Sequence, residues 1–386
     1  MTFPFLWLPL IVKNEVIRSL GHKECIILVL ASKRAAETVR MARIKTPSPL
    51  IDISATDSIQ LWHGKVVLFL NQEGKPLVKE AQIIKSEELK KWTNQSSNSV
   101  LENLGRVYNE IKNIFRFEEQ FNLLFSSDYK KVTTVKEVLS DPTMKNWGDF
   151  YFDGETIDPE ELKMIMDMAS PERSFFSYAK ECPIDFRHEN AFKFRYSQFK
   201  DARWVKIEDL YKFTNGQDVS LLRNNFTKTQ IKEFISYWVN SEIDMFRRVV
   251  IKKMEAFDLN EIADGLTLLH IEGWRPRFTK ATSSKQRQKT LLYLHNSEKL
   301  LILSAWVPGT FAGDNGEPEY DRIVNNKQGV IELLIEKKQL DMEWESADRE
   351  NKQRISNRLR QLDDEIEDYG VYFVDGEATL SDPIDD

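Results

Sequence analysis

Residue types suited to catalysis or metal binding are scattered along this sequence. The five histidines stand at positions 22, 63, 188, 270 and 295, with no HExxH pattern and no second ligand at metal spacing. Asp314-Asn315-Gly316-Glu317 lies in a glycine-rich segment but lacks the D-x-[DN]-x-[DN]-G spacing of a calcium loop, which favours a plain turn. The sequence contains no nucleophile elbow, phosphate-binding loop or kinase signature. We therefore expect no catalytic residue, no cofactor and no metal site.

One segment combines positive charge with aromatic rings. Residues 274–289 contain no acid, and Trp274 and Phe278 are interleaved with six basic residues, Arg275, Arg277, Lys280, Lys285, Arg287 and Lys289. Charge runs are usually solvated, so a solvated loop is the first interpretation. The functional alternative is a docking patch for an acidic substrate segment, with the candidate residues Trp274, Arg275, Arg277, Lys285 and Arg287. Nucleic acid stacked on the aromatic rings is a weaker alternative.

The net charge of −7 is unevenly distributed. Residues 361–386 hold ten acidic side chains and no Lys or Arg. Without these ten, 54 basic residues face 51 acidic ones, so the rest of the chain carries +3. A dedicated nucleic-acid-binding protein would be strongly basic, and we expect no nucleic-acid partner. The acidic end is most simply a solvated tail.

The N-terminal stretch FPFLWLPLIVKNEVIRSL is apolar but differs from a signal peptide. No basic residue precedes Phe3, Pro4 and Pro9 interrupt the apolar run, and no small-residue cleavage site follows. The run is also too short and too broken for a membrane helix. The two cysteines, Cys25 and Cys182, are too few for a disulfide framework or a zinc site. We expect no membrane association and a reducing compartment, cytoplasmic and/or nuclear.

The same stretch has the spacing of a helix. Pro9 suits a helix start, Val12, Val16 and Leu20 follow at helical spacing, and Gly21 would end the helix. An apolar segment over 25–30 and a basic helix from Ser32 come next. Three short helices bury little surface alone, so such a module requires a partner. The alternative is an ordinary helical hairpin that caps a larger domain.

Residues 8–35 resemble the F-box without a gap. Leu8-Pro9 matches its leading Leu-Pro, Val16-Ile17 with Leu20 matches its Ile-Leu-x-x-Leu, and Ser32-Lys33-Arg34 matches its Val-Ser-Lys-Arg, preceded by the matching leucines 28 and 30. Three positions depart from the pattern, because Cys25, Ala31 and Ala35 replace the usual Leu, Val and aromatic residue. These smaller side chains would loosen the module.

The body of the chain alternates between strand-like and helix-like segments. Residues 46–150 read as a linking region of mixed strand and helix, and from about Thr156 each strand–helix unit takes roughly 20 to 30 residues. Strands are expected near Lys193–Phe199, Asp218–Asn224 and Phe246–Ile251, stacked side by side. Because no glycine-rich phosphate loop follows a strand, we favour a leucine-rich-repeat-like solenoid over a doubly wound domain.

Three local patterns predict individual helices in this part of the chain. Asp158-Pro159-Glu160-Glu161 is expected to start one helix, and Asp258 with Glu261 three residues later has the pattern of a capping box. A packed terminal helix is expected from the apolar spacing of Ile355, Leu359, Leu362 and Ile366.

Three segments of this body resemble the F-box-associated type 2 domain of nematode F-box proteins. They are Asp201–Phe213, Asp218–Glu242 and Val249–Leu266. Trp204, the Phe226-Thr227 helix start, Trp238 and Gly265 fall where that domain has its aromatic residue, threonine, tryptophan and glycine. The order of the domains also agrees, with the F-box at the N-terminus.

Together the two resemblances imply an α/β chain with a three-helix F-box over 1–45, a linking region over 46–150, a leucine-rich-repeat-like domain over 151–310 and a C-terminal extension with an acidic tail over 311–386. They imply a substrate-recognition subunit of an SCF-type ubiquitin ligase, itself not catalytic. Its partners would be a Skp-type adaptor, through it a cullin, and a protein substrate of unknown identity. The expected adaptor-binding residues are Leu8, Pro9, Val12, Val16, Ile17, Leu20, Ile26 and Leu30.

The alternative from a different class is a secreted or membrane-anchored protein with an N-terminal signal segment and a protein-binding solenoid. Two glycosylation sequons support it, Asn94-Gln95-Ser96 and Asn225-Phe226-Thr227. Sequons also arise often by chance, and Asn225 belongs to an expected strand–helix junction.

Overall fold

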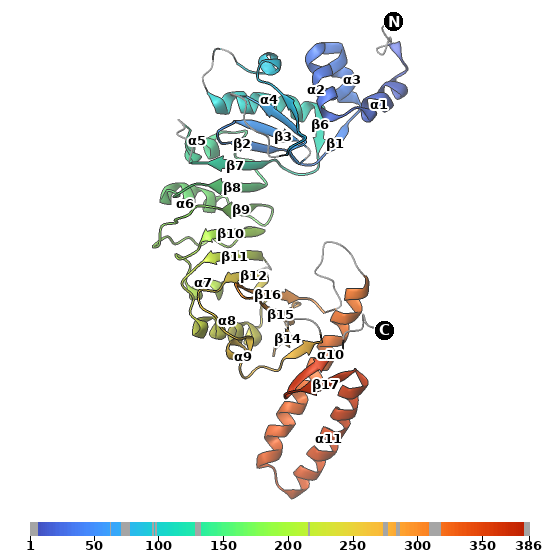
Figure 1. The fold of residues 1–386 in the computed structure, drawn as a ribbon, viewed down its shortest axis with the longest axis vertical. Coiled ribbons are helices and arrows are strands. Elements are labelled where there is room, and N and C mark those ends of the chain that lie inside the picture. Colours follow the sequence, from blue (N-terminus) through green and yellow to red (C-terminus); the bar gives the residue numbers. More distant parts are fainter. Residues whose placement is uncertain are drawn as a thin grey trace. The chain divides into compact units, whose positions relative to one another are not determined.

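The computed structural model describes residues 7–61, 63–70, 78–94, 96, 99–127, 133–214, 217–272, 277–282, 286–308 and 318–381. It is a mixed α/β structure in which three N-terminal helices precede extensive β-sheet (Figure 1). Two compact units meet in the sequence between Tyr196 and Ser197. The expected boundary between residues 150 and 151 does not divide the two units, because it lies within the first of them, in the strand β8 (Asp149–Asp153). Composition alone does not reveal that this strand is hydrogen-bonded on both sides.

The three expected N-terminal helices are present as α1 (Leu10–Ser19), α2 (His22–Ala31) and α3 (Lys33–Met41). The Ser32 hydroxyl caps α3 by accepting a hydrogen bond from the Ala35 N–H at 3.1 Å. The buried side chains of these helices include Ile17, Cys25, Ile26, Val29, Ala35, Ala36 and Val39. As expected, Gly21 lies directly beyond the end of α1, where it takes an extended conformation at the N-cap position of α2.

The strands of the first unit are β1 (Ile44–Thr46), β2 (Leu50–Ile53), β3 (Ser58–Leu61), β4 (Val66–Phe69), β5 (Gln82–Ile84), β6 (Phe115–Phe117), β7 (Asn122–Ser126), β8 and β9 (Ser174–Ser177). Their main sheet has the order β5-β4-β3-β2-β7-β8-β9. Within it β2, β7, β8 and β9 are parallel, whereas β3 is antiparallel to both of its neighbours. A separate parallel pair joins β1 to β6.

The helical elements of the first unit after the N-terminal module are a short 3-10 helix (Glu88–Lys91), α4 (Val100–Ile114), α5 (Val135–Ser140) and α6 (Pro159–Asp167). The expected start of α6 is confirmed, since the Asp158 carboxylate accepts hydrogen bonds from the N–H groups of Glu160 and Glu161. A buried aromatic cluster of Trp147, Phe150, Phe175 and Phe194 fills the core beneath β8 and β9.

The second unit continues the alternation of strands and helices. Its first strands are β10 (Tyr196–Asp201), β11 (Gln217–Arg223) and β12 (Phe246–Lys252), and α7 (Ile207–Leu210), α8 (Lys228–Asn240) and α9 (Leu259–Ile262) follow them in turn. The three strands are neighbours in one sheet, and β11 and β12 are parallel, so the expected side-by-side stacking of these segments is confirmed. Asp258 and Glu261 form the expected capping box of α9.

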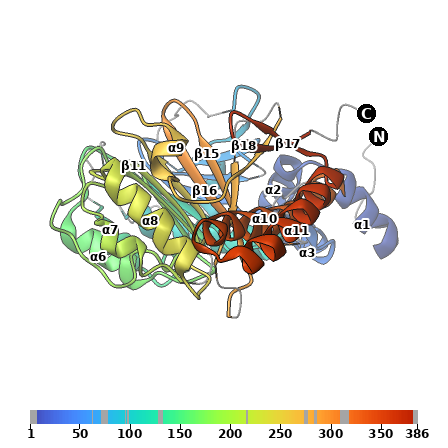
Figure 2. The same ribbon diagram turned by 90° about the horizontal axis from the view of Figure 1, so that it is seen from below.

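The remaining strands of this unit are β13 (Leu269–Ile271), β14 (Arg277–Lys280), β15 (Leu291–Asn296) and β16 (Leu300–Trp306). They extend the sheet in the order β12-β16-β15-β14-β13, and the pairs from β12 to β13 are antiparallel. The helices α10 (Pro318–Ser346) and α11 (Arg349–Asp368) run side by side, as Figure 2 shows in red. Of the four residues with the expected apolar spacing in α11, Ile355, Leu362 and Ile366 are buried and Leu359 is half-buried, which confirms the packed helix.

The expectation of a solvated acidic tail is wrong for residues 371–380. They form β17 (Val371–Val374) and β18 (Glu377–Leu380), and β18 pairs in parallel with β13. Apolar side chains between the acidic ones explain this, because Val371, Ala378 and Leu380 are buried in a core that also includes residues of α10 and α11. Residues 382–386 lie outside the described part of the chain.

Candidate functional site

The start of α1 exposes large apolar side chains. The exposed fraction is 82% for Trp7, 46% for Leu10, 78% for Ile11 and 43% for Val12. Ile17 is the buried residue of this helix, so most of the apolar surface of α1 is not covered by the rest of the structure that is described. Exposing a contiguous apolar patch is unfavourable in water, and such patches usually mark sites of protein interaction.

The residues expected to contact an adaptor fall into three groups. Pro9 and Val12 are exposed, and Leu8, Val16, Leu20 and Leu30 are half-buried. Ile17 and Ile26 are fully buried inside the three-helix module, so the expectation that they contact a partner is corrected. Helical spacing identifies an apolar face, but it does not say whether that face turns toward α2 and α3 or toward solvent.

Sequence reasoning missed four exposed apolar residues of this surface, Trp7, Leu10, Ile11 and Ile27. The signal was present, because Leu10-Ile11-Val12 is a continuous apolar run that no single helix face can bury. We call the exposed residues Trp7, Leu10, Ile11, Val12 and Ile27 the apolar surface of the N-terminal module.

The three departures from the F-box pattern lie in different environments. Cys25 and Ala35 belong to the module core, and Ala31 is exposed at the end of α2. Burial, together with the neighbouring Glu24 carboxylate, raises the pKa of the Cys25 thiol to about 11, so the thiol stays protonated at neutral pH. Two of the three small side chains, Cys25 and Ala35, are therefore buried, and none of the three belongs to the exposed large apolar residues at the start of α1.

The basic segment does not form the expected patch in the part that the structure describes. Trp274, Arg275 and Lys285 lie outside the described residues. Arg277 lies on β14 and forms an ion pair with Glu377 at 2.9 Å, so its charge is already matched. The placement of Arg287 on a docking surface is wrong, because only 5% of this residue is exposed.

Arg287 instead holds the end of α8. Its Nη1 donates hydrogen bonds to the carbonyl oxygens of Trp238 at 2.8 Å and Ser241 at 2.9 Å, and its guanidinium lies 4.0 Å from the centre of the Trp238 ring. Burial lowers the pKa of Arg287 to about 10, against the opposing effect of Asp244. Sequence alone could not show this role, because the partners are 46 and 49 residues away.

We predict that replacing Arg287 with alanine lowers the free energy of unfolding by about 2–4 kcal/mol, since two helix-end carbonyls lose their charged donor. The measurement is urea unfolding of the full chain. The matched control is Lys299→Ala, which removes an exposed cation from the same unit and should change stability by less than about 0.5 kcal/mol. Equal unfolding midpoints for the two variants would place the Arg287 side chain at the surface.

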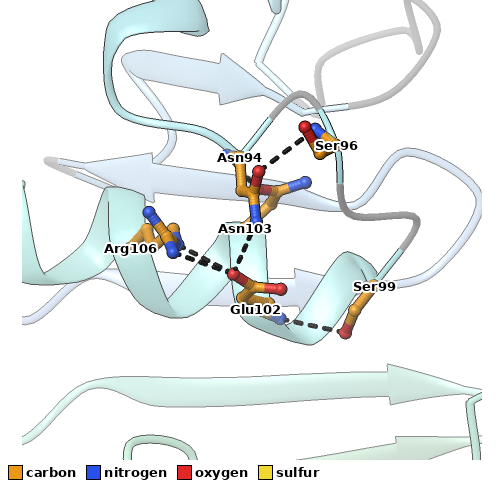
Figure 3. Close-up of polar contacts among 6 residues, drawn as sticks. All are labelled: Asn94, Ser96, Ser99, Glu102, Asn103 and Arg106. Atoms are coloured by element: carbon orange, nitrogen blue, oxygen red, sulfur yellow. Dashed lines mark hydrogen bonds and ion pairs between the residues drawn. The ribbon is translucent and has the colours of Figure 1, made fainter.

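The sequon residue Asn94 is part of a hydrogen-bond network before α4 (Figure 3). Its Nδ2 donates to Glu102 Oε1 at 3.1 Å, its N–H donates to Asn103 Oδ1 at 2.7 Å, and its Oδ1 accepts from the Ser96 N–H at 3.1 Å. In the second sequon, Asn225 Nδ2 donates to the Arg203 carbonyl oxygen at 3.4 Å. Both side-chain amides thus serve as hydrogen-bond donors in the fold.

Among the residues that the structure describes, no group of three or more His, Cys, Asp or Glu residues is arranged to hold a metal ion. None of their helices is long and apolar enough to cross a membrane.

Comparisons with known proteins add no relative. No protein-family model matches the sequence, and no curated protein and no solved structure matches it either. The resemblances described above therefore rest on the quoted residues.

Proposed function

We propose that this chain is the substrate-recognition subunit of an SCF-type ubiquitin ligase. Its N-terminal module, an F-box, binds a Skp-type adaptor and through it a cullin, and the rest of the chain binds a protein substrate. The observation that carries the proposal is the apolar surface of the N-terminal module, which the fold leaves exposed at the position of the Leu-Pro motif. A partner that covers it would remove the unfavourable contact with water.

The strand spacing supports a leucine-rich-repeat-like solenoid in the remainder of the chain. The first residues of β7, β8, β9, β10, β11 and β12 follow one another at intervals of 21 to 29 residues. Leucine-rich repeats have 20–29 residues, each with a strand that stacks in parallel on the next. The parallel pairs β7–β8, β8–β9 and β11–β12 have this geometry.

One repeat also carries the repeat motif that the sequence otherwise lacks. Val219-x-Leu221-x-x-Asn224-x-Phe226 has the L-x-L-x-x-N-x-L spacing of leucine-rich repeats. Asn224 is 1% exposed, and its Nδ2 donates to the carbonyl oxygen of Lys252 at the end of the neighbouring strand, at 2.8 Å. The asparagine thereby joins one strand–helix unit to the next.

Half-buried aromatic rings offer a surface for a protein substrate. Tyr151 on β8 is in register with Phe176 on β9, and their ring centres are 4.6 Å apart. Phe176 stacks in turn on Tyr196, with 5.0 Å between the ring centres. Burial and the adjacent Asp149 raise the pKa of Tyr151 to about 12, so the ring stays neutral. Rigid amphipathic rings of this kind are enriched at protein interfaces.

Affinity capture of the tagged full chain from cells, followed by mass spectrometry, tests the proposal. We expect a Skp-type adaptor and a cullin in the captured material, and we expect the chain to start at Met1 or Thr2 without glycan. Capture without adaptor or cullin would contradict the ligase function. A chain that starts near residues 20–35, or whose mass falls on glycosidase treatment, would favour the secreted alternative.

A further inference from the structure

A cavity of about 1060 Å³ lies in the first unit. Its walls come from three parts of the chain, namely the junction of α3 with β1, the end of α4 with β6 and the loop that follows, and residues 142–146. Pockets for ligands of drug size usually measure roughly 300–1,000 Å³, so this one has room for an organic molecule. The proposed adaptor function does not involve it.

Four cations line this cavity. They are Arg40, Arg43, Lys112 and Arg116, and they are accompanied by two acids, Glu118 and Glu119, which leaves a net lining charge of +2. Arg40 pairs with Glu110 at 3.3 Å. Within the part of the chain that the structure describes, the side chains of Arg43, Lys112 and Arg116 make no hydrogen bond or ion pair.

The ends of two helices explain only some of this charge. Arg40 and Lys112 lie in the last turns of α3 and α4, where cations favour the helix dipole. Arg43 and Arg116 lie beyond those ends, and neither donates to a helix-end carbonyl, as Arg173 does to Met168 in the same unit at 3.2 Å. Arg43 also has a φ of 48°, a left-handed conformation that a non-glycine residue adopts only at a cost of about 1 kcal/mol or more.

Tyr108 adds a hydrogen-bond donor to the wall of the cavity. The residue as a whole is only 7% exposed, but its hydroxyl is not one of the fully enclosed polar atoms, and it has no hydrogen-bond partner among the described residues. The hydroxyl can therefore donate a hydrogen bond to a ligand. The Tyr108 ring stacks on Phe117, with 6.3 Å between the ring centres, and Phe117 lines the same cavity. The wall thus combines an available donor with aromatic surface.

We propose that this cavity binds an organic phosphate monoester. Such a group carries a charge of about −1.5 to −2 at pH 7, which is opposite in sign to Arg43, Lys112 and Arg116, and guanidinium groups bind phosphate oxygens in bidentate fashion. Arg43, Lys112 and Arg116 hold the phosphate, the Tyr108 hydroxyl donates to one of its oxygens, and the organic part lies against Phe117. The phosphate belongs either to a phosphorylated protein side chain or to a free metabolite.

Calorimetric titration of the purified full chain with phenyl phosphate tests this proposal, with phenyl sulfate as a probe of nearly the same shape but a single charge. We expect phenyl phosphate to bind at least tenfold more tightly, and its affinity to fall as sodium chloride rises from 50 to 500 mM. Equal affinities for the two probes, or no binding of phenyl phosphate, would overturn the proposal.

Variants separate binding from folding. Arg116→Glu should lower the affinity for phenyl phosphate at least tenfold, and Tyr108→Phe severalfold, whereas Lys163→Glu, an exposed cation of α6, should leave it unchanged. Arg43→Gly is the sharpest variant, because glycine relieves the positive φ while the charge is lost. We expect unchanged or higher thermal stability together with at least tenfold weaker binding. Wild-type affinity in both Arg116→Glu and Arg43→Gly would refute the site.

Two further probes identify the source of the phosphate. A phosphotyrosine-containing tripeptide represents a protein side chain, and glucose 6-phosphate represents a free metabolite. The probe that binds more tightly identifies the source of the phosphate. Tighter binding of either probe supports the proposal if Arg116→Glu abolishes that binding. Binding of both probes that is insensitive to Arg116→Glu would mean that the cations of the cavity do not hold the phosphate.

Discussion

Replacing Asn224 with alanine is expected to lower the free energy of unfolding by about 3 kcal/mol or more. Asn224 Nδ2 donates to the carbonyl oxygens of Leu222 at 3.0 Å and Lys252 at 2.8 Å, and its Oδ1 accepts from the Phe226 N–H at 3.0 Å. Alanine would leave these buried groups without partners, and each such group costs about 1–3 kcal/mol. The effect is large because one side chain forms hydrogen bonds with the backbone at the ends of two neighbouring strands, β11 and β12.

The neighbouring Asn225 provides the matched control. It is exposed, and its side chain makes one hydrogen bond with the described residues, at 3.4 Å, so Asn225→Ala should cost less than about 0.5 kcal/mol. Urea unfolding of the full chain, with hydrogen exchange over residues 217–252, measures both variants. If Asn224→Ala unfolds at the same urea concentration as Asn225→Ala, the asparagine does not join the ends of the two strands.

Introducing aspartate at both Ile11 and Val12 is expected to weaken adaptor binding by at least a hundredfold. Both side chains are exposed, so the substitutions disturb no core contact. In a complex they would be buried, and two lost anchors of about 2 kcal/mol each, with charges placed in an apolar contact, exceed the 2.8 kcal/mol that a hundredfold change requires. Titration of the purified variant with a Skp-type adaptor measures the loss.

Ile184→Asp is the control for this prediction. Ile184 is also exposed, at 59%, but it belongs to the loop after β9. It should leave the adaptor affinity unchanged and so exclude a general effect of removing apolar surface. Unchanged affinity in the Ile11 and Val12 double variant, with circular dichroism like that of the wild type, would show that the adaptor docks elsewhere.

Local signals in the sequence predicted the local structure well. Asp158 and Asp258 cap the helices expected after them, and Thr227 forms a capping box with Gln230 at the expected start of α8. Such caps join residues two or three positions apart, so the pattern that forms them is visible in the sequence. The spacing of apolar residues in α11 is local in the same way.

Features that depend on distant residues were not predicted. The strand β18 pairs with β13, more than a hundred residues earlier, so the acidic composition of the C-terminal segment concealed it. The position of Arg287 in a run of basic residues predicted a surface charge, but its guanidinium packs on the ring of Trp238, which is distant in the sequence. Ile17 and Ile26 have the spacing of a docking face, but the packing of three helices against one another turns them inward.

In the candidate sites too, local sequence signals were predictive and contacts between distant residues were not. The Leu-Pro motif located the apolar surface to within a few residues, although the most exposed members, Trp7 and Ile11, lie beside the motif positions. The cations of the cavity could not be foreseen, because Arg43, Lys112 and Arg116 come from separate segments that only the fold brings together.

The most direct test of adaptor binding by the N-terminal module is calorimetric titration of the purified full-length chain with a purified Skp-type adaptor. We predict a one-to-one complex whose formation has a negative heat capacity change, since apolar surface is buried. A titration without binding heat at any temperature, together with separate elution of the two proteins on size-exclusion chromatography, would contradict it.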